Sequence, residues 1–185
     1  MRLHWVAVPQ GRLATAAAPR REQLDSEIRG LRREAVDVVV SALGVDEAAR
    51  LGLEREGELV AAEGMRFVQL PMPDFGVPDD LHAAVAVLED LAAELTSDRG
   101  MVIHCRAGIG RCSTLAASVL ARLGTPPEAA MDAVSAARGI RVPETIGQRM
   151  WVHSQLRVGD RSPLAGRSGL VRTENDPTST LGSGT

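Results

Sequence analysis

The sequence predicts an α/β fold, in which a central, mostly parallel sheet is flanked by helices. Short apolar runs rich in β-branched residues alternate along the chain with longer segments of helical periodicity. The apolar runs show little polar alternation, as expected for strands buried on both faces of a parallel sheet. The repeated order of strand and helix favours such a sheet, with helices packed against it. A hydrophobic content of 44% is enough to build its core.

The first half of the chain supplies four predicted strands. Two short strands, LHWVAV and RLATAA, are separated by a Pro-Gln-Gly turn, and a helix over 24–34 follows them. The run VDVVVSAL at 36–43 is typical of a fully buried strand. An acidic, alanine-rich stretch over 46–63 predicts one or two short helices, and MRFVQL is the next strand.

The second half begins with the loop PMPDFGVPDD at 71–80. A long helix follows, with Asp79 or Asp80 as its N-cap, and then the buried strand MVIH at 101–104. The segment STLAASVLARL predicts a helix. Thr125 before Pro126 predicts the N-cap of another helix, PPEAAMDAVSAAR. A last helix is expected from about Pro143 to about Leu156.

From residue 160 onward Gly, Ser, Thr, Pro and Asp dominate, and the periodicity ends. We therefore expect one folded domain over 1–159 and a disordered C-terminal tail over 160–185.

Composition narrows the functional class. The formal net charge of −3 does not support a nucleic-acid-binding protein, which would carry clustered basic residues. No apolar run approaches the roughly 20 residues of a membrane span, and the N-terminus does not resemble a secretory signal. Two cysteines seven positions apart do not form a disulfide framework. These observations predict a cytoplasmic protein that binds neither nucleic acid nor membrane.

The segment HCRAGIGR at 104–111 predicts an anion-binding loop between a buried strand and a helix. Gly108 and Gly110 permit backbone angles that direct successive amide groups toward one point. The helix that begins near Arg111 adds its N-terminal amides to this anion-binding loop. The planar guanidinium of Arg111 can donate to two phosphate oxygens at once. Cys105 is expected at the floor of this cradle.

The same loop predicts a reactive thiol. An ordinary cysteine has a pKa near 8.5, and lowering it to about 5 requires roughly 4–5 kcal/mol. One charge-assisted hydrogen bond supplies only about 1.5–3 kcal/mol, so several donors must converge on the sulfur of Cys105. Asp74, in the Pro- and Gly-rich loop, is the candidate general acid, with Asp79 as the alternative. Both loops follow strands, so they are expected at the carboxyl edge of the sheet, where α/β proteins bind ligands.

These residues resemble those of the cysteine-dependent protein-tyrosine and dual-specificity phosphatases. HCRAGIGR matches their His-Cys-x5-Arg signature residue for residue, and PDFGVPD resembles the Asp loop of the kinase-associated phosphatase branch and its bacterial relatives. The Asp loop precedes the Cys loop, as in that superfamily. The resemblance covers roughly residues 1–157. It implies an α/β phosphatase domain and a phosphoprotein substrate.

The resemblance also implies roles for individual residues. Cys105 would be the nucleophile that forms a phosphocysteine, and Asp74 the acid that protonates the leaving group. His104 would orient the loop, and Gln148 would position the hydrolytic water or be a plain helix-surface residue. No metal or cofactor is required. The phosphate would be bound by the side chain of Arg111 with the amides of Arg106, Ala107, Gly108, Ile109 and Gly110.

The position after the arginine departs from the family pattern. The family usually has Ser or Thr there, whereas this chain has Cys112, followed by Ser113. A thiol donates a weaker hydrogen bond, so hydrolysis of the intermediate is expected to be slower. Cys112 is either a packing residue at the helix start or a thiol that traps oxidised Cys105 as a reversible disulfide.

Three functions from different classes remain. The first is a metal-independent phosphatase acting on phosphotyrosine and also on phosphoserine or phosphothreonine. The second is an inactive or weak pseudophosphatase that only binds phosphate. The third is another thiol enzyme, such as a sulfurtransferase or an arsenate reductase, which Arg111 and Asp74 disfavour.

Overall fold

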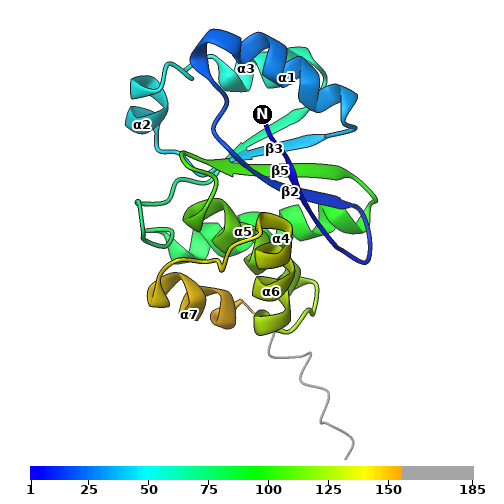
Figure 1. Cartoon of the computed structure of the whole chain (residues 1–185), viewed down its shortest axis with the longest axis vertical. Coiled ribbons are helices and arrows are strands. Elements are labelled where there is room, and N and C mark those ends of the chain that lie inside the picture. The colour runs from blue at the N-terminus through cyan, green and yellow to red at the C-terminus, as the bar shows by residue number, and fades with distance from the viewer. Residues whose placement is uncertain (156–185) are drawn as a thin grey trace, which may run out of the picture.

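A computed structural model describes residues 1–155 of the chain (Figure 1). The predicted tail at 160–185 lies outside the described residues. The elements in chain order are β1 (His4–Val6), β2 (Arg12–Ala17), the 3-10 helix η1 (Arg21–Gln23), α1 (Leu24–Arg33), β3 (Val38–Ser41), α2 (Val45–Arg50), α3 (Glu56–Ala62), β4 (Arg66–Gln69), α4 (Leu81–Thr96), β5 (Gly100–Cys105), α5 (Gly110–Arg122), α6 (Pro127–Arg138) and α7 (Ile146–Ser154).

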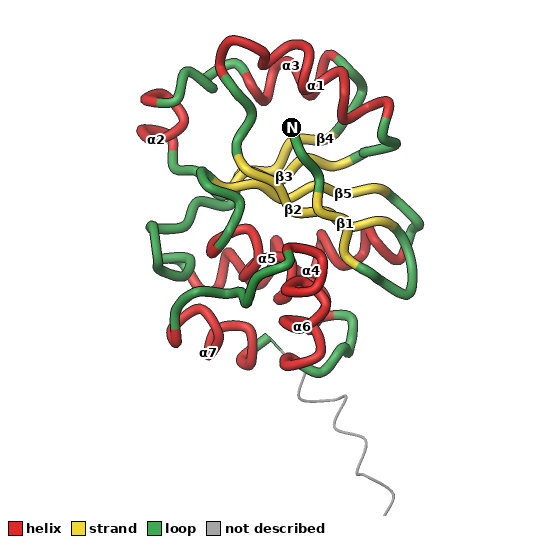
Figure 2. Tube along the Cα trace, in the orientation of Figure 1, coloured by secondary structure: helices red, strands yellow, loops and turns green. Residues whose placement is uncertain are grey.

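The strands form one sheet in the order β1-β2-β5-β3-β4. Strands β2, β5, β3 and β4 run parallel to their neighbours, and only β1 pairs antiparallel, with β2. Helices α1, α2 and α3 lie on one side of the sheet, and α4 to α7 lie on the other (Figures 1 and 2). The predicted α/β fold with a mostly parallel sheet is therefore confirmed.

Each face of the sheet has its own apolar core, because successive side chains of a strand point to opposite faces. On β3, Val38 and Val40 pack in the core shared with α4 and α5, whereas Val39 packs in the core beneath α1. All three are fully buried. Burial on both faces explains why the sequence of β3 is a nearly continuous apolar run.

The parallel pairing brings the predicted site loops together. Cys105, the last residue of β5, pairs with Ala17 at the end of β2, and Ser41 at the end of β3 pairs with His104. The backbone amides of Leu70 and Met72 donate to the carbonyls of Ser41 and Ala42. The loop that contains Asp74 therefore starts beside the ends of β3 and β5, as predicted.

The helix boundaries confirm one predicted cap and correct another. Asp80 is the N-cap of α4, and its carboxylate accepts a hydrogen bond from Ala83 N at 2.9 Å. The predicted N-cap at Thr125 is wrong, since Pro126 holds that position in α6. Gly124 is left-handed at φ 88°, and Thr125 N donates to Leu120 O. Thr125 is therefore part of the C-terminal closure of α5.

The last helix begins three residues later than the sequence predicts. Thr145 has an extended backbone, and its hydroxyl accepts from Gln148 N while the Gln148 side chain accepts from Thr145 N. This capping box fixes the start of α7 at Ile146 rather than near Pro143. The predicted end at Leu156 lies outside the described residues. Within residues 1–155, no helix combines the length and apolar character that crossing a bilayer requires.

Candidate active site

The loop between β5 and α5, residues 105–111, is the loop for which the sequence predicts phosphate binding, and we call it the P-loop. Gly108 has a positive φ of 71°. A Cβ at this position would lie 2.5 Å from Ala17 N and 2.6 Å from the carbonyl carbon of Ala16. Only glycine fits, because both the backbone angle and the contact with β2 exclude a side chain. The P-loop is thus held against the end of β2.

Cys105 lies at the floor of this loop and is 2% exposed. The thiol of Cys112 donates to its sulfur, and the backbone amides of Cys112, Gly108 and Ile109 donate as well. These hydrogen bonds outweigh burial and lower the pKa of Cys105 from 9.0 to about 6. That change corresponds to about 4 kcal/mol of preference for the thiolate. Several donors converge on the sulfur, as the sequence predicts.

Cys112 stays protonated beside this thiolate. It is fully buried in the first turn of α5. Burial raises its pKa well above 9.0, and the neighbouring Cys105 raises it further. Cys112 is therefore a hydrogen-bond donor to Cys105, the candidate nucleophile. Ser113, the next residue, is also buried in α5.

Arg111 is fixed by a carboxylate that the sequence analysis did not single out. Its Nη1 and Nη2 donate to Glu47 Oε2 at 2.6 Å and Oε1 at 3.0 Å, and Nη1 also donates to Met72 O at 3.3 Å. This pairing raises the pKa of Arg111 and lowers that of Glu47. A guanidinium has five N–H donors, so Nε and the second hydrogen of Nη2 remain on one edge without a hydrogen bond. Two donors on one edge match two phosphate oxygens.

Asp74 faces that free edge. Its Oδ1 lies 3.5 Å from Arg111 Nε, and its side chain is 63% exposed. A groove of about 490 Å³ lies between α2 and the Asp loop, and Asp74, Asp79 and Arg106 contribute to its lining. The structure therefore brings the predicted acid into the site. It leaves Asp79, the alternative acid, beside the same groove.

Gln148 joins the Asp loop to the P-loop. It is fully buried, and its Nε2 donates to Gly76 O at 3.2 Å. A second link comes from Thr145, whose hydroxyl donates to Phe75 O at 3.2 Å. A Cβ on Gly110 would lie 3.3 Å from both polar atoms of the Gln148 amide. Gln148 thus lies at the site, and it is not a surface residue.

His104 directly precedes Cys105, the candidate nucleophile, and is buried. Its Nε2 is 2.9 Å from Glu56 Oε1, and the two side chains are 0% and 2% exposed. The contact lacks the alignment of a hydrogen bond. Glu56 is the first residue of α3, where the helix dipole favours a negative charge. It is the second acidic residue of the site that the sequence analysis missed.

The remaining predicted residues line the mouth of the cradle. Arg106 and Ala107 are exposed, and Ile109 is half-buried. The amide of Ile109 points to the Cys105 sulfur. The backbone amides of residues 106–110 are the ones to which the sequence analysis assigned phosphate binding.

Comparison with known proteins agrees with this geometry. The family model described as "Polymorphic toxin system, DSP-PTPase phosphatase" matches residues 14–125, more than half of the chain. Cyclin-dependent kinase inhibitor 3 of Rattus norvegicus is 33% identical over 105 residues, covering 56% of this chain and 49% of the relative. The Mus musculus protein is 35% identical over 105 residues, with 56% and 48% covered. The chain spans about half the length of these curated relatives.

Solved structures share the fold. A kinase-associated phosphatase whose catalytic cysteine is replaced by serine has a TM-score of 0.74 at 22% identity, covering 83% of this chain and 92% of its own. The active form of the phosphatase Tk-PTP has a TM-score of 0.64 at 22% identity, with 81% and 95% covered.

Proposed function

Since the chain belongs to the dual-specificity phosphatase family described for polymorphic toxin systems, we propose that it hydrolyses phosphotyrosine, and also phosphoserine and phosphothreonine, on protein substrates. The observation that carries this proposal is the convergence of donors on Cys105, whose pKa is lowered to about 6. At neutral pH the nucleophile is then mostly thiolate. The P-loop amides and the free edge of Arg111 bind the phosphate above it.

In the first step the Cys105 sulfur attacks phosphorus and forms the S–P bond of a phosphocysteine. The P–O bond to the leaving group breaks, and Asp74 gives its proton to the departing oxygen. Arg111 and the loop amides stabilise the charge on the three equatorial oxygens. Glu47 keeps the guanidinium in place through its two hydrogen bonds.

In the second step a water attacks phosphorus, and Asp74, now a carboxylate, accepts its proton. The S–P bond breaks, phosphate leaves and the Cys105 thiolate is restored. The Cys112 thiol and the loop amides stabilise this departing thiolate. We assign Gln148 to positioning the water, because it is buried beside Gly110.

A catalytically weak or inactive phosphate-binding pseudophosphatase is the second candidate, and the thiol at Cys112 favours it. A thiol is a weaker donor than the usual hydroxyl, so release of the phosphocysteine would be slow. The phosphatase domain is proposed to span 1–159. Both cysteines of the chain are free, and a thiolate nucleophile suits a reducing compartment such as the cytoplasm.

The experiment is a single turnover of a phosphotyrosine peptide, quenched in acid and analysed by mass spectrometry. We expect a phosphoryl group on Cys105 in the wild type and in Cys112→Ala, where it persists longer. Cys105→Ser is the control and should carry none. Peptide hydrolysis without any phosphoryl adduct on Cys105 would refute the covalent mechanism, and an adduct that is never released would identify the pseudophosphatase.

A further inference from the structure

A pocket of about 200 Å³ lies between α2, α3 and the sheet. Ser41, the last residue of β3, forms part of its wall and pairs with His104 in the sheet. Glu56, the first residue of α3, also lines the pocket, and its Oε1 lies 2.9 Å from His104 Nε2. Since His104 directly precedes Cys105, the pocket lies one residue of β5 away from the candidate nucleophile.

The walls of this pocket are mostly apolar. They include Val45 and Ala48 of α2, Leu53 of the loop after α2, Gly57 of α3 and Phe67 of β4. A Cβ on Gly57 would lie 3.0 Å from Phe67 Cδ1, so the aromatic ring lies directly against α3. An apolar cavity of about 150 Å³ is large enough to bind benzene. The pocket therefore has room for a molecule with a single aromatic ring.

The charged side chains of the pocket are both acidic. Glu54 and Glu56 line it, and within residues 1–155 no basic side chain does. Glu54 is exposed and forms no ion pair in this part of the chain. Glu56 is buried, and its Oε1 has no hydrogen-bond partner among the described residues. Because a buried carboxylate oxygen is normally hydrogen-bonded, Glu56 favours a ligand that brings a donor.

The shape and charge of the pocket together identify a class of ligand. Two carboxylates attract a cation, and an ammonium group supplies three hydrogen-bond donors. The ring of Phe67 is also compatible with a cation, since the face of an aromatic ring attracts positive charge. The apolar walls suit an apolar body. A small organic amine with one ring combines these features.

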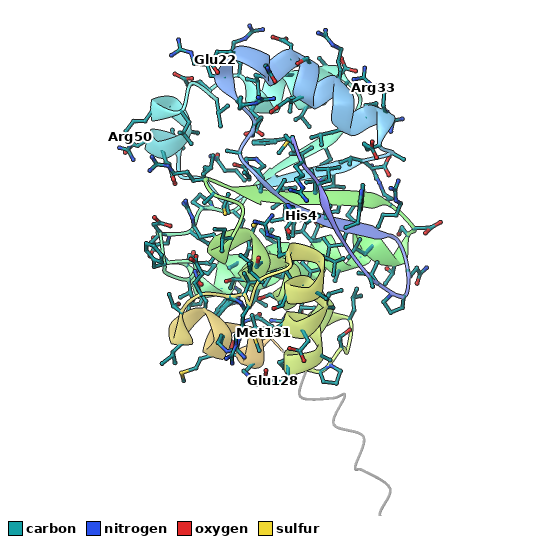
Figure 3. All side chains as sticks on the ribbon, viewed as in Figure 1. His4, Glu22, Arg33, Arg50, Glu128 and Met131 are labelled. Carbon is teal, nitrogen blue, oxygen red and sulfur yellow. The ribbon has the colours of Figure 1, made fainter. Side chains whose placement is uncertain are left out.

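Helix α2 separates this pocket from the groove that contains Asp74. Val45 and Ala48 line the pocket, whereas Glu47 lines the groove and pairs with Arg111. No residue of α2 is buried, and Figure 3 shows Arg50 at its outer end. A helix with so little buried apolar surface is free to shift. A ligand beneath α2 would add contacts to Val45 and Ala48 and would thereby fix the position of Glu47.

We propose that the pocket between α2 and α3 binds a small organic amine, and that its occupation strengthens phosphate binding at the P-loop through α2. The ammonium group donates to Glu56, and the ring packs beneath α2. A more firmly held Glu47 keeps Arg111 in the orientation that binds phosphate, which lowers the cost of ordering the guanidinium on binding. The effect on phosphate rests on the proposed function, because it acts on the same site, whereas binding of the amine does not.

Calorimetric titration of the full chain with benzylamine tests the pocket, and benzyl alcohol is the matched neutral probe. We expect benzylamine to bind about tenfold more tightly, a ratio that corresponds to about 1.4 kcal/mol. Glu56→Gln and Glu54→Gln should each reduce this ratio, and the exposed position of Glu54 keeps that variant folded. Ala48→Leu should abolish binding of both probes, because leucine fills the space beneath α2. Ala49→Leu is its control, since Ala49 is exposed on the same helix and outside the pocket.

Titration with inorganic phosphate, with and without benzylamine, tests the coupling. Saturating benzylamine should tighten phosphate binding about fivefold or more, and phosphate should tighten benzylamine binding by the same factor. Glu47→Ala should keep benzylamine binding and lose the coupling, because Glu47 lies outside the pocket and holds Arg111. Asp46→Asn, an exposed neighbour on α2, should keep both.

Equal affinity for benzylamine and benzyl alcohol would overturn the proposed class of ligand, and benzylamine binding that survives in Ala48→Leu would overturn the site. Benzylamine binding that leaves the affinity for phosphate unchanged would overturn the coupling. Failure of the proposed function looks different: the wild type would hydrolyse no phosphopeptide, while the coupled binding of benzylamine and phosphate remains.

Discussion

The carboxylate of Glu47 holds the guanidinium of Arg111 end-on, through hydrogen bonds of 2.6 Å and 3.0 Å. This pair connects α2 to the P-loop across 64 positions of sequence. It leaves the Nε edge of Arg111 free for phosphate and close to Asp74. The edge of Arg111 that we propose to bind phosphate is therefore already oriented without a ligand.

Replacing Glu47 tests this orientation. Glu47→Ala frees the guanidinium to rotate, so KM for an aryl phosphate and the inhibition constant of vanadate should each rise about tenfold, a loss of ~1.4 kcal/mol. Asp46→Asn is the matched control, since Asp46 is an exposed neighbour on α2. Steady-state kinetics checks both variants. Unchanged vanadate inhibition in Glu47→Ala would show that Arg111 needs no support.

The thiol of Cys112 sets the pH dependence of the nucleophile. Since the pKa of Cys105 is lowered to about 6, kcat/KM should rise with pH through about 6 as the thiolate forms. Cys112→Ala removes a donor to the thiolate, so the pKa of Cys105 and the rising limb should both move to higher pH. Cys112→Ser keeps a donor and should leave the limb near 6. Iodoacetamide alkylation rates against pH provide the measurement, and identical profiles in all three proteins would contradict this role.

Asp74 and Asp79 line the same groove, and each is a candidate for the proton donor that the proposed mechanism requires. Asp74 is the one near Arg111, so Asp74→Asn should lower kcat about 10²-fold or more on a phosphate ester with a poor leaving group. With a leaving group that needs no proton, the loss should be much smaller. Asp79→Asn is the matched control and should retain most activity. The reverse ranking would assign the acid to Asp79.

The two free cysteines should form a disulfide under peroxide. The Cys105 thiolate attacks hydrogen peroxide, giving a sulfenic acid and hydroxide, and the Cys112 sulfur then displaces water to form the S–S bond. We expect peptide mapping after partial inactivation to find residues 105 and 112 linked, with activity restored by dithiothreitol. In Cys112→Ala, the same treatment should give irreversible loss. If partly inactivated wild-type protein contained sulfinic Cys105 and no linked peptide, the predicted disulfide would be wrong.

Glu56 supports the P-loop through His104. Glu56→Ala removes a buried side chain that lies 2.9 Å from the imidazole of His104, and the lost contact and packing should cost about 1–3 kcal/mol of stability. Glu58→Ala, an exposed position on the same helix, is the control. Urea unfolding of both variants measures the difference. Equal midpoints would mean that the contact contributes nothing to the folded state.

The sequence allowed prediction of the sheet, the P-loop and the Asp loop because each depends on local signals. The apolar run of β3 follows from burial on both faces, and Gly108 has the positive φ that the sequence suggested. Gly110, in contrast, has no positive φ and is the first residue of α5. Glu47 and Glu56 carry no comparable signal, since each is one acid among several in an acidic stretch. Their importance depends on where α2 and α3 dock against the sheet, a long-range property of the fold.

Thr125 illustrates a different error. A local signal was present, but the residue lies at the end of α5 instead of capping α6. A threonine before proline fits an N-cap, but the left-handed Gly124 draws Thr125 into the end of α5. The cap of α7, Thr145, was missed because Pro143, two residues earlier, gave the more obvious helix start. Its capping box needs the pair Thr145 and Gln148 to be considered together.

The most direct test of the central claim is hydrolysis of p-nitrophenyl phosphate in EDTA by the wild type and by Cys105→Ser. We predict turnover by the wild type that is lost in the variant while both proteins remain folded by circular dichroism. Turnover that survives in Cys105→Ser would contradict the assignment of Cys105 as the nucleophile.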